Sequence, residues 1–343
     1  MRKLLNTLYV SSQGSYLRKE GETIVVEREG KTAAQMPVHT IGSVVCFGNV
    51  LVSPFLLGSC AERDVGISFL TEHGRFLASV RGPVSGNVLL RRQQYRMADE
   101  EAATRAIAAN IVSAKIANGR IVMNRAIRDH GERLDAESVR DASTAMDRLM
   151  DSISRAPDVD SIRGIEGMAA AEYFSCFNEL IVDQKGDFHF GERNRRPPLD
   201  PVNALLSFVY TLVMHDVRSA LESVGLDPAV GFLHRDRPGR AGLALDVMEE
   251  FRPSVADRLV LSLINRRQVA ARGFKRSEGG GIVMDDDTRK TVLVEYQSRK
   301  QDEIEHPYLG EKIPVGLLYF VQANLLARFI RGDLDGYPPF FWR

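Results

Sequence analysis

The stretch from Gly225 to Phe251, GLDPAVGFLHRDRPGRAGLALDVMEEF, gathers the side chains best suited to chemistry. His234 follows a turn-rich lead-in, and the basic loop after it contains Arg235, Arg237 and Arg240. If the chain is helical from about Leu243, three carboxylates at i, i+3 and i+4 share one side of the helix: Asp246, Glu249 and Glu250. An imidazole, a cationic loop and a carboxylate face together suggest a metal site that acts on phosphates.

A second acidic element, DSIRGIEGMAAAEYF from Asp160 to Phe174, also predicts a helix, capped by Asp160 or Ser161. One face of this helix combines a carboxylate, small residues and a phenol: Glu166, Ala169, Ala170 and Tyr173. Gly164 and Gly167 are unexpected inside a helix, because each costs roughly 1 kcal/mol against alanine. We therefore expect backbone, a ligand or a metal to approach there, although a glutamate beside alanines is more often solvated surface.

Each of these residues also has an ordinary structural explanation. A histidine after Gly-Phe-Leu more often forms a structural hydrogen bond than binds a ligand, and Glu249-Glu250 alone most often forms the wet edge of a helix. Taken together, however, one imidazole and carboxylates from separate elements form a mixed nitrogen and oxygen donor set. Such a set suits Mg²⁺ or Mn²⁺ better than zinc.

Two basic clusters have the composition of phosphate-binding segments. Arg193, Arg195 and Arg196 precede Pro197-Pro198, which predicts an extended and exposed segment. The second cluster lies between Asn265 and Ser277, without acidic residues, and contains Arg266, Arg267, Arg272, Lys275 and Arg276. Arginine forks bind phosphate oxygens without reading sequence. The alternative for each cluster is a merely solvated segment end, and neither interleaves aromatics for base stacking.

The elements that must position these side chains fall into two regions. Residues 1–83 contain short apolar runs broken by turn signals, which favours an antiparallel β-sandwich-like domain. A short helix near Ser53–Glu62 interrupts the strands, since Pro54 suits a first helical turn. The glycines and the proline between Arg81 and Asn87 predict the domain boundary.

Residues 84–343 show helical periodicity and predict a larger all-α domain, so the chain belongs to the α+β class. After the first helical stretches, we expect helices at 160–180, 201–224, 243–270, 286–305 and 313–331. Three consecutive glycines within 273–287 favour a hairpin or loop between helices. The adjacent prolines near the C-terminus exclude a regular helix there.

Composition narrows the class of protein. The formal net charge of zero gives no sign of a general nucleic-acid binder, so any such activity must come from local clusters. The three cysteines form no Cys-x-x-Cys pair, which indicates reduced thiols and neither a disulfide framework nor a zinc site. The sequence shows no secretory signal and no bilayer-spanning segment, so we expect a cytoplasmic protein with no membrane partner.

Four spaced motifs occur together in this chain. They are Gly164-Ile-Glu166-Gly followed by Tyr173-Phe, then Asp200-Pro-Val-Asn203, then Gly225-Leu-Asp-Pro leading to His234, and finally Gly239-Arg240 leading through Asp246 and Glu249 to Arg252-Pro. In this order they resemble the CRISPR-associated DNA integrase family, the larger adaptation subunit of CRISPR systems. The resemblance covers essentially the whole chain. The tail, from residues 299–304 to Tyr337-Pro-Pro-Phe, is most similar to the subtype I-C version.

The resemblance implies a β domain that takes part in dimerisation, residues 1–83, and an all-helical catalytic domain, residues 84–343. It implies a homodimer that works with a smaller adaptation subunit. The implied metal ligands are Glu166, His234 and an acid of the fourth motif, by position Glu249, with Asp246 beside it; the alignment also permits the reverse. Tyr173 and Asn203 would position the ligands, and the arginines expected to contact DNA are Arg195, Arg196, Arg235, Arg240, Arg266 and Arg267.

The implied reaction is a transesterification on double-stranded DNA. The 3′-hydroxyl of a captured spacer attacks a phosphodiester at the edge of the CRISPR repeat, and with water as nucleophile the same site is an endonuclease. Bound Mg²⁺ or Mn²⁺ polarises the phosphoryl oxygen, and Arg240 or Arg235 holds the phosphate. Two other classes stay open: a non-catalytic DNA-binding scaffold that positions spacer ends, and a metal-dependent hydrolase of small phosphoesters.

Overall fold

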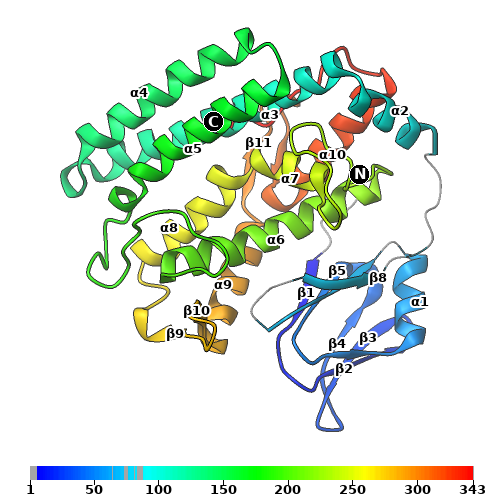
Figure 1. Cartoon of the computed structure of the whole chain (residues 1–343). Coiled ribbons are helices and arrows are strands. Elements are labelled where there is room, and N and C mark those ends of the chain that lie inside the picture. Colours follow the sequence, from blue (N-terminus) through cyan, green and yellow to red (C-terminus); the bar gives the residue numbers. More distant parts are fainter. Residues whose placement is uncertain (1–5, 64, 73–75, 81, 83–87, 343) are drawn as a thin grey trace. The chain divides into compact units, whose positions relative to one another are not determined.

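The computed structural model describes residues 6–63, 65–72, 76–80, 82 and 88–342, and these residues form two units. The described residues up to 82, together with Arg289–Asp302, make a β-rich unit, and residues 88–288 and 303–342 make a helical unit (Figure 1). The predicted α+β class, with a β-rich region before a larger helical one, is confirmed. The turn segment predicted as the boundary falls mostly outside the described residues, so a boundary between residues 83 and 84 stays a prediction.

The β-rich unit contains two four-stranded sheets. In spatial order, the first comprises β1 (Asn6–Val10), β5 (Ile41–Phe47), β7 (Gly66–Leu70) and β8 (Phe76–Val80), and the second β4 (Lys31–Pro37), β3 (Thr23–Arg28), β2 (Tyr16–Glu20) and β6 (Leu51–Val52). The uniformly antiparallel pairing expected from close strand spacing does not form, because β5 pairs in parallel with both β1 and β7. Parallel neighbours need a crossover connection, and between β5 and β7 it includes α1 (Pro54–Glu62).

Helix α1 begins where the sequence predicts. Ser53 accepts a hydrogen bond from the backbone N–H of Leu56 at 3.3 Å, and Pro54 occupies the first helical turn. Leu56 packs with Leu17 and Ile24 of the second sheet and Val44 of the first, so both sheets and the helix share one core. This core gives the β-rich unit its own stability.

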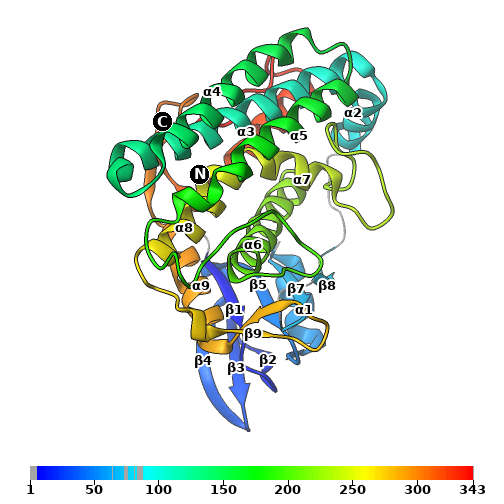
Figure 2. The same ribbon diagram turned by 60° about the vertical axis from the view of Figure 1, so that its left-hand side comes forward.

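The helical unit is built around three long helices that lie side by side in both views, α3 (Glu101–His130), α4 (Ala136–Ser152) and α5 (Val159–Ser175) (Figures 1 and 2). The other helices of this unit are α2 (Val88–Asp99), α6 (Pro201–Ser223), α7 (Gly242–Glu249), α8 (Arg258–Asn265) and α10 (Val315–Arg331), whereas α9 (Asp286–Arg299) belongs mostly to the β-rich unit. Helix α6 packs against α7 and α10, and α3 packs against α7. These contacts bring the two acidic motifs to the same part of the unit.

The single helix expected over 243–270 is interrupted. A π-helix, Arg252–Asp257, separates α7 from α8. Pro253 lies in its first turn, and a proline lacks the N–H that a continuous α-helix requires. Single π-helical turns are common at functional sites, and this one carries two ionisable residues, Arg252 and Asp257, into the interior.

The other predicted elements are present in the structure, and only some of their end residues differ from the prediction. The glycine-rich stretch forms an antiparallel hairpin of β9 (Phe274–Arg276) and β10 (Ile282–Met284), as expected. The helix predicted to reach residue 305 ends at Arg299, because residues 303–305 form β11 and pair with β12 (Lys312–Pro314). No described residue after Arg331 is helical, as the adjacent prolines require. None of the described helices combines the length and apolar character needed to cross a bilayer.

Candidate functional site

Helix α5 carries Glu166 beside its buried face. The helix is capped by Asp158, whose carboxylate accepts the N–H of Ser161 at 2.7 Å. The cap predicted at Asp160 or Ser161 is therefore wrong, because the helix begins earlier than expected. Ile162, Ile165, Ala169 and Tyr173 bury one face, and the Glu166 side chain beside it keeps 26% of its surface exposed.

The His234 loop is built around Asp246, which is fully buried on α7. Its carboxylate accepts the backbone N–H groups of Phe232 at 2.6 Å, Leu233 at 2.9 Å and His234 at 2.9 Å. The Nδ1 atom of His234 lies 2.6 Å from Asp246 Oδ1. This contact fixes the ring and leaves Nε2 as the nitrogen that can bind a metal. A Cβ at Gly231 would lie 2.7 Å from the same carboxylate, so only glycine permits this approach.

Helix α2 anchors the lead-in to this loop. The buried Gln94 side chain donates to the carbonyl oxygens of Asp227 at 2.8 Å and Val230 at 2.9 Å, and accepts the N–H of Asp227 at 2.9 Å. The Tyr95 hydroxyl donates to the Asp227 carboxylate at 2.8 Å. Gln94 was not predicted from the sequence, although its polar side chain falls four positions after the apolar Leu90 and hence on the same helix face.

Glu249 is almost completely buried and is held by two cations. Its Oε2 atom lies 2.7 Å from Nζ of Lys115 on α3, and its Oε1 atom lies 3.1 Å from Arg252. Burial opposes ionisation of Glu249, but Arg252 and then Lys115 outweigh it and lower its pKa to about 2. Glu249 is therefore a carboxylate throughout the neutral range.

Lys115 also pairs with Glu166, so both carboxylates meet at one ammonium group. His234 lies close enough to act electrostatically on Glu249, and Arg163 of α5 donates to the carbonyl oxygen of Leu233 beside it. Within the described residues, no three His, Cys, Asp or Glu side chains are placed to hold an ion as they stand. Two carboxylates and an imidazole on three elements nevertheless form a donor set that fits Mg²⁺ or Mn²⁺.

A buried polar cluster lies behind these residues. The Arg252 guanidinium stacks over the Tyr210 ring at 4.8 Å, and the Tyr210 hydroxyl donates to Asp257 at 2.6 Å. Burial raises the pKa of Asp257 to about 6. Tyr173 lines a small cavity together with Lys115 and Asp257, and its buried hydroxyl interacts with the Asp257 carboxyl group. This part of the site is therefore closely packed around Arg252.

Asn203, predicted to position the metal ligands, forms its hydrogen bonds with the basic segment before α6. Its side chain accepts the Asn194 N–H at 3.1 Å and Arg193 Nη1 at 2.6 Å, and donates to the carbonyl oxygen of Glu192 at 2.8 Å. It thus orders the basic segment before α6, and it makes no hydrogen bond to Glu166, His234 or Glu249 in the described structure.

The wet helix edge, which is the ordinary explanation of Glu249-Glu250, would expose Glu250, but this side chain is fully buried. It accepts hydrogen bonds from the Tyr337 hydroxyl at 2.5 Å, the Phe340 N–H at 2.7 Å and the Gln322 amide at 2.9 Å. This explanation is wrong because α7 ends at Glu249, and the C-terminal segment covers the next residue. Burial raises the pKa of Glu250 to about 7.

The candidate DNA-binding arginines divide into paired and unpaired groups. Arg235 pairs with Asp160, and Arg267 pairs with Asp183 at 2.9 Å. In the part of the chain that the structure describes, no ion pair involves Arg195, Arg196, Arg240 or Arg266. Partial burial, followed by the charge of Arg237, lowers the pKa of Arg240. Three guanidinium groups, those of Arg237, Arg163 and Arg195, act on Arg240 against the single carboxylate of Asp246, and this excess of positive charge suits a phosphate.

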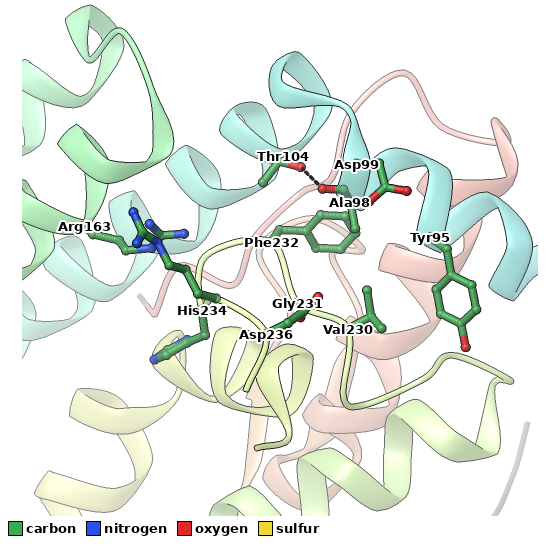
Figure 3. Close-up of a pocket in the computed structure, with 11 residues that line it drawn as sticks. Tyr95, Ala98, Asp99, Thr104, Arg163, Val230, Gly231, Phe232, His234 and Asp236 are labelled. Atoms are coloured by element: carbon green, nitrogen blue, oxygen red, sulfur yellow. Dashed lines mark hydrogen bonds between the residues drawn. The ribbon is translucent and has the colours of Figure 1, made fainter. Parts of the chain in front are cut away.

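A cleft of about 360 Å³ opens beside His234 (Figure 3). It is lined by residues from α2, the start of α3, α5 and the His234 loop, among them Tyr95, Asp99, Thr104, Arg163, Phe232 and Arg235. His234 and Arg163 lie at one side of the cleft and Tyr95 at the other (Figure 3). The His234 side chain, 20% exposed, is therefore accessible from solvent.

Sequence comparison identifies the family. Residues 8–298 match the family model described as CRISPR associated protein Cas1. The chain belongs to the Cas1 family. The CRISPR-associated endonuclease Cas1 1 of Chlorobaculum tepidum is 56% identical over 343 residues, which are 100% of both chains. The resemblance drawn from the four motifs is thereby confirmed at the level of the family.

Solved structures share the Cas1 fold. A casposase bound to integration product has a TM-score of 0.82 at 21% identity, over 97% of this chain and 93% of that one. A Cas6-RT-Cas1–Cas2 complex contains a chain with a TM-score of 0.83 at 22% identity, over 98% of this chain and 36% of that one. Both likenesses concern the whole length of the present chain, so its β-rich and helical parts are both parts of the Cas1 fold.

Proposed function

We propose that this chain is a divalent-metal-dependent DNA integrase and endonuclease of CRISPR adaptation. The observation that carries the proposal is the convergence of Glu166 and Glu249 on one cationic group beside the fixed ring of His234. Membership of the Cas1 family and the high identity to a CRISPR-associated endonuclease support it.

Glu166, His234 and Glu249 are the proposed ligands of Mg²⁺ or Mn²⁺. Asp246 is assigned a positioning role, because its two oxygens already receive three backbone N–H groups and the His234 ring. A second row of hydrogen bonds of this kind commonly orients a metal-binding histidine. Arg252 pairs with Glu249 and is itself held by Tyr210, whose hydroxyl donates to Asp257, so this buried cluster fixes the position of the Glu249 carboxylate.

In strand joining, the oxygen of the spacer 3′-hydroxyl bonds to phosphorus, and the bond to the departing 3′-oxygen of the repeat breaks. The metal, when bound, supplies charge stabilisation at the phosphoryl oxygens. Arg240 holds a phosphate oxygen. Glu249 is already deprotonated and His234 is already oriented, so both are ready to bind the metal. The attacking hydroxyl loses one proton and the departing 3′-oxygen gains one, so the protons balance over the reaction. With water as nucleophile, the same arrangement hydrolyses the strand.

Double-stranded DNA and a Cas2-type subunit are the proposed partners. Support comes from the casposase bound to integration product and the complex containing Cas2, both of which contain this fold.

A homodimer through the β-rich unit is also proposed. Phe55 is 83% exposed and Leu51 is 64% exposed on that unit, and such apolar side chains favour an interface. Light scattering of the chain and of Phe55→Ser tests the dimer.

Two finer assignments accompany this function. The tail, with Tyr337-Pro-Pro-Phe, supports assignment to subtype I-C. The DNA substrate and the free thiols, Cys46, Cys60 and Cys176, support a place in the reducing cytoplasm.

Strand joining in vitro tests the proposal. Glu166→Ala, His234→Ala and Glu249→Ala should each abolish joining of a spacer to repeat-containing duplex while duplex binding survives. Glu172→Ala, on the same helix as Glu166 but outside the donor set, is the matched control and should retain joining. Joining by all three site variants would favour the non-catalytic scaffold. Turnover of mononucleotide esters without duplex DNA would favour the small-phosphoester hydrolase.

A further inference from the structure

Lys115 lies at the point where the two proposed carboxylate ligands converge. Its Nζ atom is 2.7 Å from Glu249 Oε2 and also pairs with Glu166. The Lys115 side chain is 14% exposed and that of Glu249 only 3%. Two carboxylates brought together away from water repel each other unless a cation lies between them. Lys115 therefore holds Glu166 and Glu249 together in the chain as it stands.

The second cation of the site is fixed in place. Arg252 contacts the other oxygen of Glu249 at 3.1 Å, and its guanidinium stacks on Tyr210 at 4.8 Å. The side chain starts from the buried π-helix and is 16% exposed. A lysine is different, since it is a compact charge on a flexible four-carbon stem. Of the two cations, Lys115 is the one that can withdraw from the carboxylates.

We propose that Lys115 is a built-in counter-ion that competes with the divalent cation for Glu166 and Glu249. This inference rests on the proposed metal centre. A doubly charged ion and an ammonium group repel each other, so the two compete for the oxygens of these carboxylates. Lys115 thus keeps the donor set assembled without metal, and its ammonium group leaves the carboxylates when metal binds. It is a positioning residue that also sets the affinity for the metal.

Removal of this charge tests the proposal by metal binding, without any activity measurement. Lys115→Met keeps the length of the side chain and removes the ammonium group. We expect its Kd for Mn²⁺, measured by calorimetry on the full chain, to fall about tenfold, because the competitor is gone. The metal-free variant should have a lower Tm than the metal-free unchanged chain. Addition of Mn²⁺ should raise the Tm of the variant more than that of the unchanged chain.

Lys185→Met is the matched control. Lys185 is half exposed and lies 3.7 Å from Glu179, outside the proposed centre, so this variant should bind Mn²⁺ like the unchanged chain. A Kd of Lys115→Met that is unchanged or higher would overturn the role of Lys115 and leave the metal centre standing. Absence of Mn²⁺ binding to the unchanged chain would overturn the metal centre and this inference with it.

A second measurement needs no substitution and decides the question even if Lys115→Met does not fold. Amine acetylation of the unchanged chain is followed by mass spectrometry with and without Mn²⁺. We expect Lys115 to be acetylated several-fold faster with Mn²⁺, because its ammonium group no longer pairs with carboxylates, while Lys185 keeps its rate. Equal rates at Lys115 under the two conditions would contradict the displacement.

Discussion

The Nδ1 atom of His234 lies 2.6 Å from Oδ1 of Asp246, and the same carboxylate receives the backbone N–H groups of three consecutive residues that end at His234. Asp246 therefore holds both the ring and the loop that carries it. Glu249 lies about one helical turn later on α7 and pairs with Lys115. The two acids of one motif thus have different surroundings, which supports Glu249 as the proposed ligand.

Substitution of Asp246 is expected to weaken the metal centre without removing a ligand. Asp246→Asn should lower the affinity for Mn²⁺ by about 10–100-fold, as loss of a carboxylate behind a metal-binding histidine typically does. Strand joining should return in part at high Mn²⁺. Glu249→Gln should give no joining at any Mn²⁺ concentration. Titration of joining against Mn²⁺ checks this, and rescue of Glu249→Gln but not Asp246→Asn would reverse the assignment.

The two glycines beside Glu166 should be replaceable without damage to the fold. A Cβ at Gly164 or Gly167 would meet no atom within 4 Å, so of the three expected neighbours the protein backbone is excluded, and a ligand or a metal stays a prediction. Gly164→Ala with Gly167→Ala should raise the free energy of unfolding by about 1–2 kcal/mol in total. If DNA approaches this open face, strand joining should fall several-fold in the same variant.

Denaturant unfolding and strand joining of the double variant measure the two effects. Gly131→Ala, at another site with open space around the added Cβ, is the control for joining. A stabilised double variant with full joining would show that no ligand approaches α5 at these glycines.

Unpaired and paired arginines should differ in their effect on DNA binding. Arg240→Gln should weaken duplex binding several-fold and reduce the slope of log K against log salt by about one, as loss of one phosphate contact does. Arg267→Gln should change neither quantity appreciably, because Asp183 already pairs with that guanidinium. Salt titrations of duplex binding check both variants, and an equal loss in the two would contradict the division.

Stability should fall as the pH rises towards neutrality. The folded-state pKa of Glu250 is raised to about 7 by burial, so its contribution is complete below about pH 4.5 and is lost as the pH rises through about 7. Asp257, raised to about 6, acts in the same direction. Glu249, lowered to about 2, acts oppositely, since its contribution is present above about pH 4.5 and is lost in stronger acid.

Replacement of Glu250 isolates its share of this dependence. Glu250→Gln should remove roughly 1–3 kcal/mol of the change in unfolding free energy between pH 4.5 and 8. Tyr337 and Gln322 can still hydrogen-bond to the amide, so the C-terminal segment should stay in place. Denaturant unfolding at several pH values gives the slopes, and an unaltered slope in this variant would contradict the raised pKa.

Much of the fold and part of the site could be predicted from the sequence. Turn signals and periodicity located the β-rich region, α1 and the β9–β10 hairpin, because these features depend on local chemistry. The spacing of His234, Asp246 and Glu249 placed an imidazole and carboxylates near one another, and the structure brings Glu166 to Glu249 through Lys115. The family resemblance implied that Glu166 belongs to the same site as His234 and Glu249.

Other parts depend on contacts between distant segments and had no local signal. Lys115 lies in a long helix and gains its role only when α5 and α7 pack beside it. Glu250 looked like surface because the C-terminal residues that bury it come more than eighty positions later. The parallel pairing of β5 arises from a crossover, which strand spacing alone does not reveal.

The position of a bound ion tests the central claim most directly. Crystals of the chain grown with Mn²⁺ and measured at the manganese absorption edge would locate the metal by its anomalous signal. The account predicts one ion about 2.0–2.3 Å from carboxylate oxygens of Glu166 and Glu249 and from His234 Nε2, with Asp246 still on His234 Nδ1. An ion held by Asp246, or one bound away from Glu166 and Glu249, would contradict it.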